Sequence, residues 1–365
     1  MESTIHKYRP NSRNCMEMAS KTKSGINTMT NTVCSVVVTY NRKNLLVKCI
    51  DALINQELKP DAIYIVDNNS TDQTQQTLYE HKYIDVMVDE NSSNIQQTEK
   101  NYENIIIRYI HLPENVGGAG GFYEGVKQAH EDQYDWIWIM DDDAYPTLTC
   151  LKNLQPYYDL PDISALASLK VDMDDNILYH HRGYFNFEKG LPIQEHITDE
   201  DLKEDVIDVD MVSFVGLLVK STAIDKIGYP KREFFIHTDD LEYCIRLRQV
   251  GKIKLIKNSI IKHAEGSVKG TYTKKVLNIK AKRRPYDKLW INYYMQRNLI
   301  WLGRKYTKNK ISLYTTILKN YLLTVMGIVV FDDHKYKRLK FFTNAYIDGL
   351  TSHFDNKKPR KILYE

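Results

Sequence analysis

Three consecutive aspartates, Asp141, Asp142 and Asp143, directly follow the apolar segment Trp136–Met140. Adjacent carboxylates repel one another, and a bound cation would remove that repulsion. Mg2+ and Mn2+ take oxygen ligands, and when one or two carboxylates bind them they usually bridge to substrate phosphates. Side chains alternate along a strand, so Asp141 and Asp143 are expected on one face and Asp142 on the other. The triplet therefore predicts a divalent-cation site, and a solvated acidic turn is the alternative.

Two further groups could complete such a site. His263 follows an apolar segment, and imidazole is a good third ligand for Mn2+; a capping or surface histidine is the alternative. Asp239 and Asp240 open a helix predicted over Thr238–Val250. The helix dipole stabilises an anion there by about 0.3 to 1 kcal/mol, but capping explains only one of the two. A carboxylate held near a bound substrate could act as a general base.

A glycine-rich segment, Asn115–Phe122 (NVGGAGGF), precedes the triplet. It lacks the lysine and the Ser or Thr of a phosphate-binding P-loop, and its spacing is not that of a dinucleotide-binding GxGxxG motif. We predict a tight turn that leads into a helix over about 122–130. The segment is either simply a turn or a place where the backbone approaches a ligand closely.

Strand-like and helix-like segments alternate along the first two thirds of the chain. This pattern predicts an α/β fold whose central sheet is mostly parallel and covered on both faces. Ligands of such sheets bind at the carboxyl ends of the strands, where Asp67, the glycine-rich segment and the triplet all fall. A polar stretch over 82–103 is expected to contribute no strand. The predicted strands cover 34–40, 62–66, 105–110, 136–140, 163–169, 212–219 and 254–261.

Composition limits what the rest of the chain can do. The 365 residues are 42% hydrophobic, enough for the core of one large or two modest domains and too many for global disorder. The five cysteines stand singly, which is typical of a reducing, intracellular compartment. Residues 1–31 are polar without sustained periodicity, which predicts a mobile N-terminal extension without a signal peptide.

Helices are predicted at the C-terminal end, over 287–306, 311–331 and 336–350. The most apolar part, Tyr321–Phe331, has about half of the roughly 20 residues that a membrane span needs, so it is not expected to cross a bilayer alone.

The motifs, taken in order, resemble those of a known family. TYNR, VDNNSTD, ENVGGAGGF, WIMDDDAYP, HTDDLEYCIRL and HAEGS are similar to those of family 2 glycosyltransferases of the GT-A fold. Within that family they resemble the bacterial galactofuranosyl and rhamnosyl transferase branch. The resemblance covers about residues 33–270. It implies a Rossmann-like GT-A nucleotide-diphospho-sugar transferase domain over 32–272, followed by a basic helical C-terminal region over 273–365.

The resemblance also implies roles for individual residues in an inverting transfer from a nucleotide-activated sugar. Asp141, Asp143 and His263 would hold Mn2+ or Mg2+. Asp240 would take the proton from the acceptor hydroxyl, with Asp239 as the alternative base. Asp67 would contact the nucleotide base. The residues expected around the donor are Thr39, Asp67, Asn69, Asn115, Gly117, Gly118, Gly121 and Asp142.

The same resemblance favours UDP-galactofuranose as the donor and a lipid-linked or cell-surface glycan as the acceptor. A rhamnosyltransferase that uses dTDP-rhamnose is the main alternative. A sugar nucleotidyltransferase would be expected to carry a glycine- and lysine-rich loop where TYNRKN stands. A non-catalytic saccharide-binding protein has no need for the triplet, the Asp239–Asp240 pair and His263 together.

Basic clusters interleaved with aromatic residues mark the C-terminal region, at Lys280–Pro285, Tyr293–Asn298 and Lys357–Lys361. We interpret them as attraction to an anionic leaflet or to a polyprenyl diphosphate rather than to nucleic acid. A solvated basic face is the alternative. The expectation is a cytoplasmic protein attached peripherally to the inner face of the cell membrane.

Overall fold

The computed structural model describes residues 31–264, 271–276 and 279–365. Thr32–Glu365 form one compact unit. Residues 1–30 of the predicted extension lie outside the described residues, as do Glu265, Gly266 and Ser267 of the HAEGS motif.

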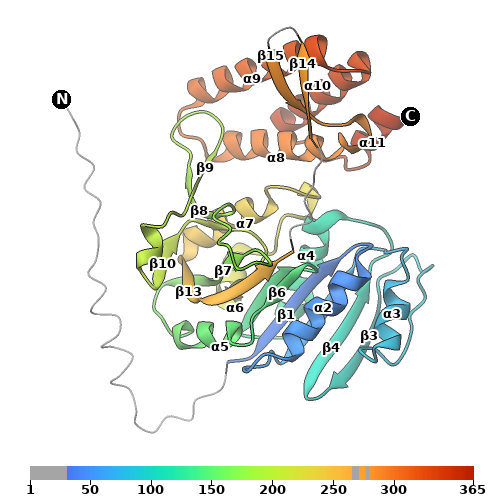
Figure 1. Cartoon of the computed structure of the whole chain (residues 1–365), viewed down its shortest axis with the longest axis vertical. Coiled ribbons are helices and arrows are strands. Elements are labelled where there is room, and N and C mark those ends of the chain that lie inside the picture. Colours follow the sequence, from blue (N-terminus) through green and yellow to red (C-terminus); the bar gives the residue numbers. More distant parts are fainter. Residues whose placement is uncertain (1–30, 265–270, 277–278) are drawn as a thin grey trace, which may run out of the picture. The chain divides into compact units, whose positions relative to one another are not determined.

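A ten-stranded sheet forms the centre of this unit, in the order β10-β13-β7-β12-β5-β1-β2-β4-β3, with β6 paired to β13 (Figure 1). The central strands β5, β1, β2 and β4 pair in parallel, as do β7 and β13, so the predicted parallel core is confirmed. Antiparallel pairs involve β3, β6, β10 and β12. The strands are β1 (Val33–Thr39), β2 (Ala62–Asp67), β3 (Gln96–Tyr102), β4 (Ile105–His111), β5 (Trp136–Asp141), β6 (Ala144–Pro146), β7 (Ile163–Val171), β10 (Val206–Val209), β12 (Leu217–Lys220) and β13 (Lys252–His263).

Helices cover both faces of the sheet, and β1 and β2 are therefore buried along their whole length. On one face, α4 packs Phe122 and Val126 into a cluster with Val36 of β1. On the other face, α2 packs Leu46 and Ile50 against neighbouring strands. The helices of this part are α2 (Lys43–Ile54), α3 (Thr74–Glu80), α4 (Gly117–Glu131), α5 (Cys150–Leu154), α6 (Ser221–Ile227) and α7 (Asp239–Val250), with short 3-10 turns η1 (Gln155–Tyr157), η2 (Asp201–Lys203) and η3 (Arg232–Phe234).

Three local predictions were wrong. The polar stretch 82–103 contains β3, an edge strand whose side chains alternate between half-buried and exposed positions, so no apolar run marks it. The predicted strand over 212–219 is interrupted between β11 (Met211–Val212) and β12, where Gly216 has φ +79°. The glycine-rich segment is not a turn before a helix, because α4 already begins at Gly117. β11 belongs to a separate three-stranded sheet with β8 (Arg182–Asn186) and β9 (Ile193–His196).

The C-terminal region contains the three long helices that the sequence predicts. Two elements were not predicted, the hairpin of β14 (Tyr272–Val276) and β15 (Ile279–Arg283) and the final helix α11 (Lys358–Tyr364). α9 is longer than the apolar 321–331 segment: its 22 residues are long and apolar enough to cross a membrane, by length and composition only. The remaining elements are η4 (Tyr286–Lys288), α8 (Ile291–Tyr306), α9 (Lys310–Phe331) and α10 (Lys335–Thr351).

Candidate active site

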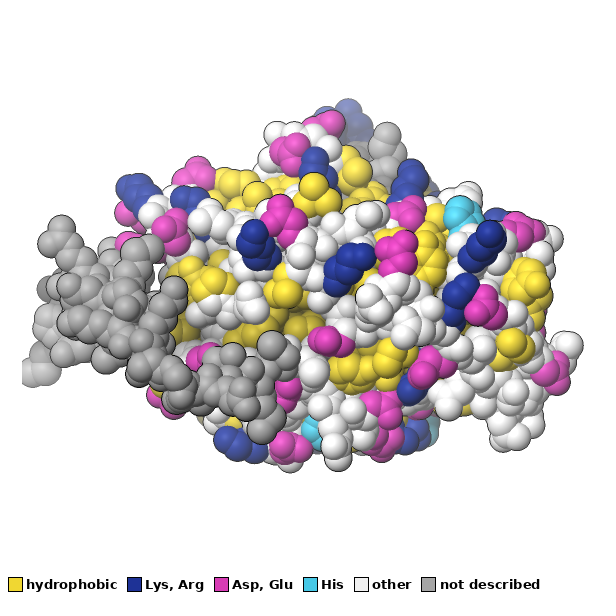
Figure 2. All heavy atoms as spheres, turned by 90° about the horizontal axis from the view of Figure 1, so that it is seen from below, with side chains coloured by type: hydrophobic (Ala, Val, Ile, Leu, Met, Phe, Trp, Pro, Cys, Tyr) yellow, Lys and Arg dark blue, Asp and Glu magenta, His cyan; other side chains and the backbone are white. Residues whose placement is uncertain are grey.

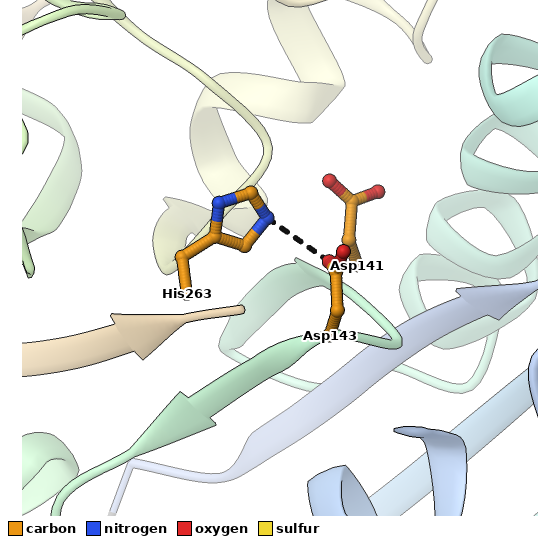
Figure 3. Close-up of side chains that lie close together, drawn as sticks. All are labelled: Asp141, Asp143 and His263. Carbon is orange, nitrogen blue, oxygen red and sulfur yellow. Dashed lines mark ion pairs between the residues drawn. The ribbon is translucent and has the colours of Figure 1, made fainter. Parts of the chain in front are cut away.

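The structure brings Asp141, Asp143 and His263 together at the end of the central sheet (Figure 3). Asp141 ends β5, and Asp143 lies in the turn that leads to β6. His263 ends β13, which pairs with β6 so that His263 stands opposite Ala144. One possible ligand atom from each of the three side chains lies within 4.8 Å of the other two. His263 Nε2 lies 2.9 Å from Asp143 Oδ1.

Asp142 points elsewhere, as predicted, but strand alternation is not the reason, because β5 ends at Asp141 and both Asp142 and Asp143 lie in the turn after it. Its Oδ2 accepts a 2.7 Å hydrogen bond from the Thr39 hydroxyl at the end of β1. Arg42, which directly precedes α2, lies 3.1 Å from Asp142 Oδ1 and 2.9 Å from Asp143 Oδ2. The sequence assigns no role to Arg42. Only the pairing of β1 with β5, which sets Val38 beside Asp141, reveals its closeness to the triplet.

The three aspartates of the triplet lie close together and are only partly compensated by the positive charge of Arg42, and this shifts their pKa values. Burial, followed by the charges of Asp143 and Asp142, raises the pKa of Asp141 well above its usual range. Burial also raises the pKa of Asp142 to about 6, although Arg42 opposes the shift. For Asp143, burial is outweighed by His263 and Arg42, so its pKa is lowered. Two carboxylates and an imidazole arranged in this way are a ligand set that Mn2+ or Mg2+ accepts, so the donor atoms fit a divalent cation.

Asp67 is enclosed by its own chain. It is 1% exposed, and its oxygens accept 2.8 Å hydrogen bonds from the Ser70 backbone N–H and the Tyr109 hydroxyl. Burial raises its pKa in spite of these bonds. These hydrogen bonds fix the turn that follows β2. Direct contact of Asp67 with a nucleotide base stays a prediction. Asn69 lies nearby, where its Nδ2 donates to the Pro113 carbonyl at 3.3 Å.

The glycines at the start of α4 mostly serve close packing. A Cβ on Gly117 would lie 2.1 Å from the Phe235 carbonyl oxygen, and one on Gly121 would lie 2.6 Å from Val38 Cγ1. A Cβ on Gly118 would meet no atom within 4 Å. Of these three glycines, only Gly118 therefore has open space beside its Cα. Asn115 Oδ1 accepts a 2.8 Å hydrogen bond from the Gly117 N–H and so helps to begin the helix.

Asp239 and Asp240 form a second acidic group at the start of α7. Burial, and then the charge of Asp240, raises the pKa of Asp239 to about 8. Burial also raises the pKa of Asp240, which the Leu241 N–H opposes with a 2.7 Å hydrogen bond. The charge of Asp239 contributes to the raised pKa of Asp141, so the two acidic groups are close enough to interact electrostatically.

Buried cations from other elements act on Asp240. Arg182 of β8 and Lys170 of β7 are each 1% exposed, and their charges oppose the rise of the Asp240 pKa. Burial lowers the pKa of Arg182 to about 10. Sequence reasoning missed both residues, because nothing local distinguishes them from other basic residues near strands.

The loop before Asp239 is strained and is held from the C-terminal region. Phe235, His237 and Thr238 have positive φ of 65°, 68° and 62°, a conformation that costs an L-residue about 1 to 2 kcal/mol. Asn298 of α8 donates from Nδ2 to the carbonyl oxygens of Phe234, Ile236 and His237 at 3.0, 3.2 and 2.9 Å.

Arg297, the neighbour of Asn298, adds bonds from Nη2 to the Glu233 and Phe234 carbonyl oxygens at 3.0 and 3.1 Å. α8 therefore fixes the backbone that leads into the second acidic group.

Solved structures of other proteins share this architecture. S. aureus TarS 1-349 in complex with UDP-GlcNAc aligns with a TM-score of 0.51 at 13% identity, over 91% of this chain and 86% of that chain. GalNAc-T7 with UDP, GalNAc and Mn2+ aligns with a TM-score of 0.53 at 10% identity, over 90% of this chain and 59% of that chain. At these identities the likeness shows the fold, which is of the GT-A type.

Sequence relatives and a family model agree with this fold. The galactofuranosyltransferase GlfT1 of Mycolicibacterium smegmatis is 28% identical over 231 residues, 61% of this chain and 68% of that protein. GlfT1 of Mycobacterium tuberculosis is 26% identical over 229 residues, 61% of this chain and 66% of that protein. The model described as glycosyl transferase family 2 matches residues 34–217, just over half of the chain. The chain therefore belongs to glycosyl transferase family 2, whose members are inverting hexosyltransferases that use nucleotide sugars.

Proposed function

We propose that the protein transfers galactofuranose from UDP-galactofuranose to a hydroxyl of a lipid-linked or cell-surface glycan. The observation that carries the proposal is the Asp141, Asp143 and His263 cluster, within electrostatic reach of the Asp239–Asp240 pair. The similarity to GlfT1 supports galactofuranose as the sugar. UDP as the carrier is supported by the UDP and UDP-GlcNAc in the two structures of the same fold.

Asp141, Asp143 and His263 would hold the Mn2+ or Mg2+ ion. When bound, the ion acts as a Lewis acid that neutralises the charge growing on the leaving diphosphate. Arg42 lies beside Asp142 and Asp143 and would place a guanidinium, a good phosphate ligand, at the same edge. Thr39 holds Asp142 away from the three ligands.

Asp240 would be the general base. As the acceptor oxygen bonds to the anomeric carbon, the bond from that carbon to the diphosphate breaks, and the hydroxyl proton passes to the Asp240 carboxylate. Lys170 and Arg182 favour the ionised form that this role needs. Asp240 is also half-buried, whereas Asp239 is buried and its pKa is raised to about 8. Asp239 remains the alternative base.

Release of the nucleotide from a panel of donors tests the proposal. With a lipid-linked glycan acceptor and Mn2+, we expect turnover of UDP-galactofuranose to exceed that of dTDP-rhamnose and of UDP-hexopyranoses. Asp143→Asn should abolish the metal-dependent turnover. Asp240→Asn should lower kcat by far more than it changes the KM for the donor. Turnover of dTDP-rhamnose instead would replace the donor. If no donor gave metal-dependent turnover, the catalytic assignment would fail.

We also infer that the protein works at the cytoplasmic face of the cell membrane. Residues 273–365 contain 21 Lys and Arg against 6 Asp and Glu, a balance that favours anionic lipid surfaces. Fractionation of cells that express the full chain should place it with membranes at low salt and release it at high salt. Recovery in the soluble fraction at every salt concentration would contradict this localisation.

A further inference from the structure

One side of α9 exposes large apolar side chains along its whole length. Their exposed fractions run from 43% at Val330 to 81% at Ile311. No other helix in the part of the chain that the structure describes exposes as many. We call this surface the α9 outer face; it consists of Ile311, Tyr314, Leu318, Leu322, Leu323, Met326, Val329 and Val330.

The spacing makes the outer face continuous. Six of its members recur every three or four residues from Ile311 to Val329. They therefore form one stripe along the helix, and this stripe is about 27 Å long. The opposite side of α9 is already used, because Leu313 and Ile317 are buried in a cluster with Ile300 of α8 and Tyr346 of α10. The helix is therefore apolar on two sides, and only one side has a partner among the described residues. An exposed apolar patch of this kind marks an interaction site.

The charge around the outer face points to the partner. Residues 271–331 have 13 Lys and Arg and a single acid, Asp287, although Arg297 is buried and Arg283 pairs with Asp332, the residue after α9. Lys319 lies exposed on α9 itself, and the hairpin strand β14 packs against α9. That hairpin exposes Lys275, Lys280 and Lys282. The end of the molecule at the bottom of Figure 1 differs, since Figure 2 shows Lys and Arg side chains interspersed with Asp and Glu there.

We propose that α9 lies in the plane of an anionic lipid surface, with the outer face at the boundary between headgroups and acyl chains and the lysines on lipid phosphates. An apolar face flanked by lysines is the pattern of an interfacial helix. A second copy of this chain is a poorer occupant, because two faces surrounded by the same positive charge repel each other.

Crossing of the bilayer by α9 is disfavoured by its neighbours. α9 packs against α8 and α10, which hold the buried charges of Arg297, Arg338 and Asp348. If α9 spanned the bilayer together with these helices, the charges would be drawn into hydrocarbon, where they are costly. An in-plane position leaves the packed side of α9 and its neighbours in water.

Vesicle flotation of the full chain tests the inference. The probes are vesicles of phosphatidylcholine alone and of phosphatidylcholine mixed with phosphatidylglycerol. We expect binding to the mixed vesicles that weakens with salt. The double substitution Leu318→Ser and Leu322→Ser should reduce the partition coefficient at least tenfold, which corresponds to about 1.4 kcal/mol.

Val86→Ser is the matched control, because Val86 is an apolar residue 62% exposed in the part of the chain before β3. It should leave vesicle binding unchanged, and thermal unfolding should show that all the variants are folded. Binding of the double variant at the level of the parent chain would overturn the proposal. It would also be overturned if the double variant turned an oligomer into a monomer without changing lipid binding, since that outcome assigns the face to a second copy. The assay needs no donor sugar, so its outcome is separate from that of the proposed transfer reaction.

Discussion

Replacement of Asn298 by alanine should separate stability from catalysis in a measurable way. Asn298 is fully buried, and its Nδ2 group is the hydrogen-bond donor for the Ile236 and His237 carbonyl oxygens. Removal of the amide leaves these acceptors without that partner, which costs about 1 to 3 kcal/mol for a buried polar group. The free energy of unfolding of Asn298→Ala should therefore fall by about that amount.

The larger effect is expected on kcat. The loop holds three residues at positive φ directly before Asp239 and Asp240, and it relaxes if its anchor is lost. A displacement of about 1 Å at a reacting group can lower the rate by about 100-fold. The KM for the donor should change little, because Asp141, Asp143 and His263 lie on β5, the turn after it and β13.

Initial rates of nucleotide release at saturating Mn2+, together with urea denaturation, give both quantities. Asn292→Ala is the matched control: Asn292 lies on the same helix, and its side-chain oxygen accepts no hydrogen bond among the described residues. A stable Asn298→Ala protein with unchanged kcat would refute the positioning role of α8. A loss of kcat matched by an equal rise in KM would point to general damage of the donor site instead.

Three other predictions follow from the geometry of the site. Gly117→Ala should lower the free energy of unfolding by about 1 to 3 kcal/mol, because the new Cβ would overlap the Phe235 carbonyl, whereas Gly118→Ala should leave the melting temperature unchanged. Mn2+ at about a hundred times its Kd should add about 2.7 kcal/mol to the free energy of unfolding, and His263→Ala should remove most of that gain in a thermal-shift titration. Burial raises the pKa of Asp239 from 3.8 to about 8, so folding favours its neutral form. The contribution of Asp239 to the free energy of unfolding is therefore full below pH 3.8 and is lost as the pH rises towards 8. In urea denaturation without metal, Asp239→Asn should reduce the fall of the free energy of unfolding over this pH range. If the pH dependence were unchanged, other carboxyl groups would be its cause.

Much of the fold is legible from local patterns. Apolar runs mark the buried strands β1, β2, β4 and β5, because a strand covered on both faces has no polar side. The start of α7 is legible from the Asp239–Asp240 pair. Elements without such a signal were missed: β3 is a half-exposed edge strand, and the β14–β15 hairpin is largely polar.

The sequence by itself determines that three carboxylates follow a buried strand, which is why the acidic cluster could be predicted. Strand alternation does not set Asp142 apart from Asp141 and Asp143, because β5 ends at Asp141 and the other two aspartates lie in the turn after it. The partners of these aspartates are decided by the tertiary structure. Arg42 and Thr39 reach Asp142 across about a hundred residues through the register of β1 with β5. Asn298 reaches the loop before Asp239 from a helix about sixty residues away. Such contacts depend on which elements become neighbours and in what register. Packing of the whole core sets that arrangement, and no short stretch of sequence encodes it.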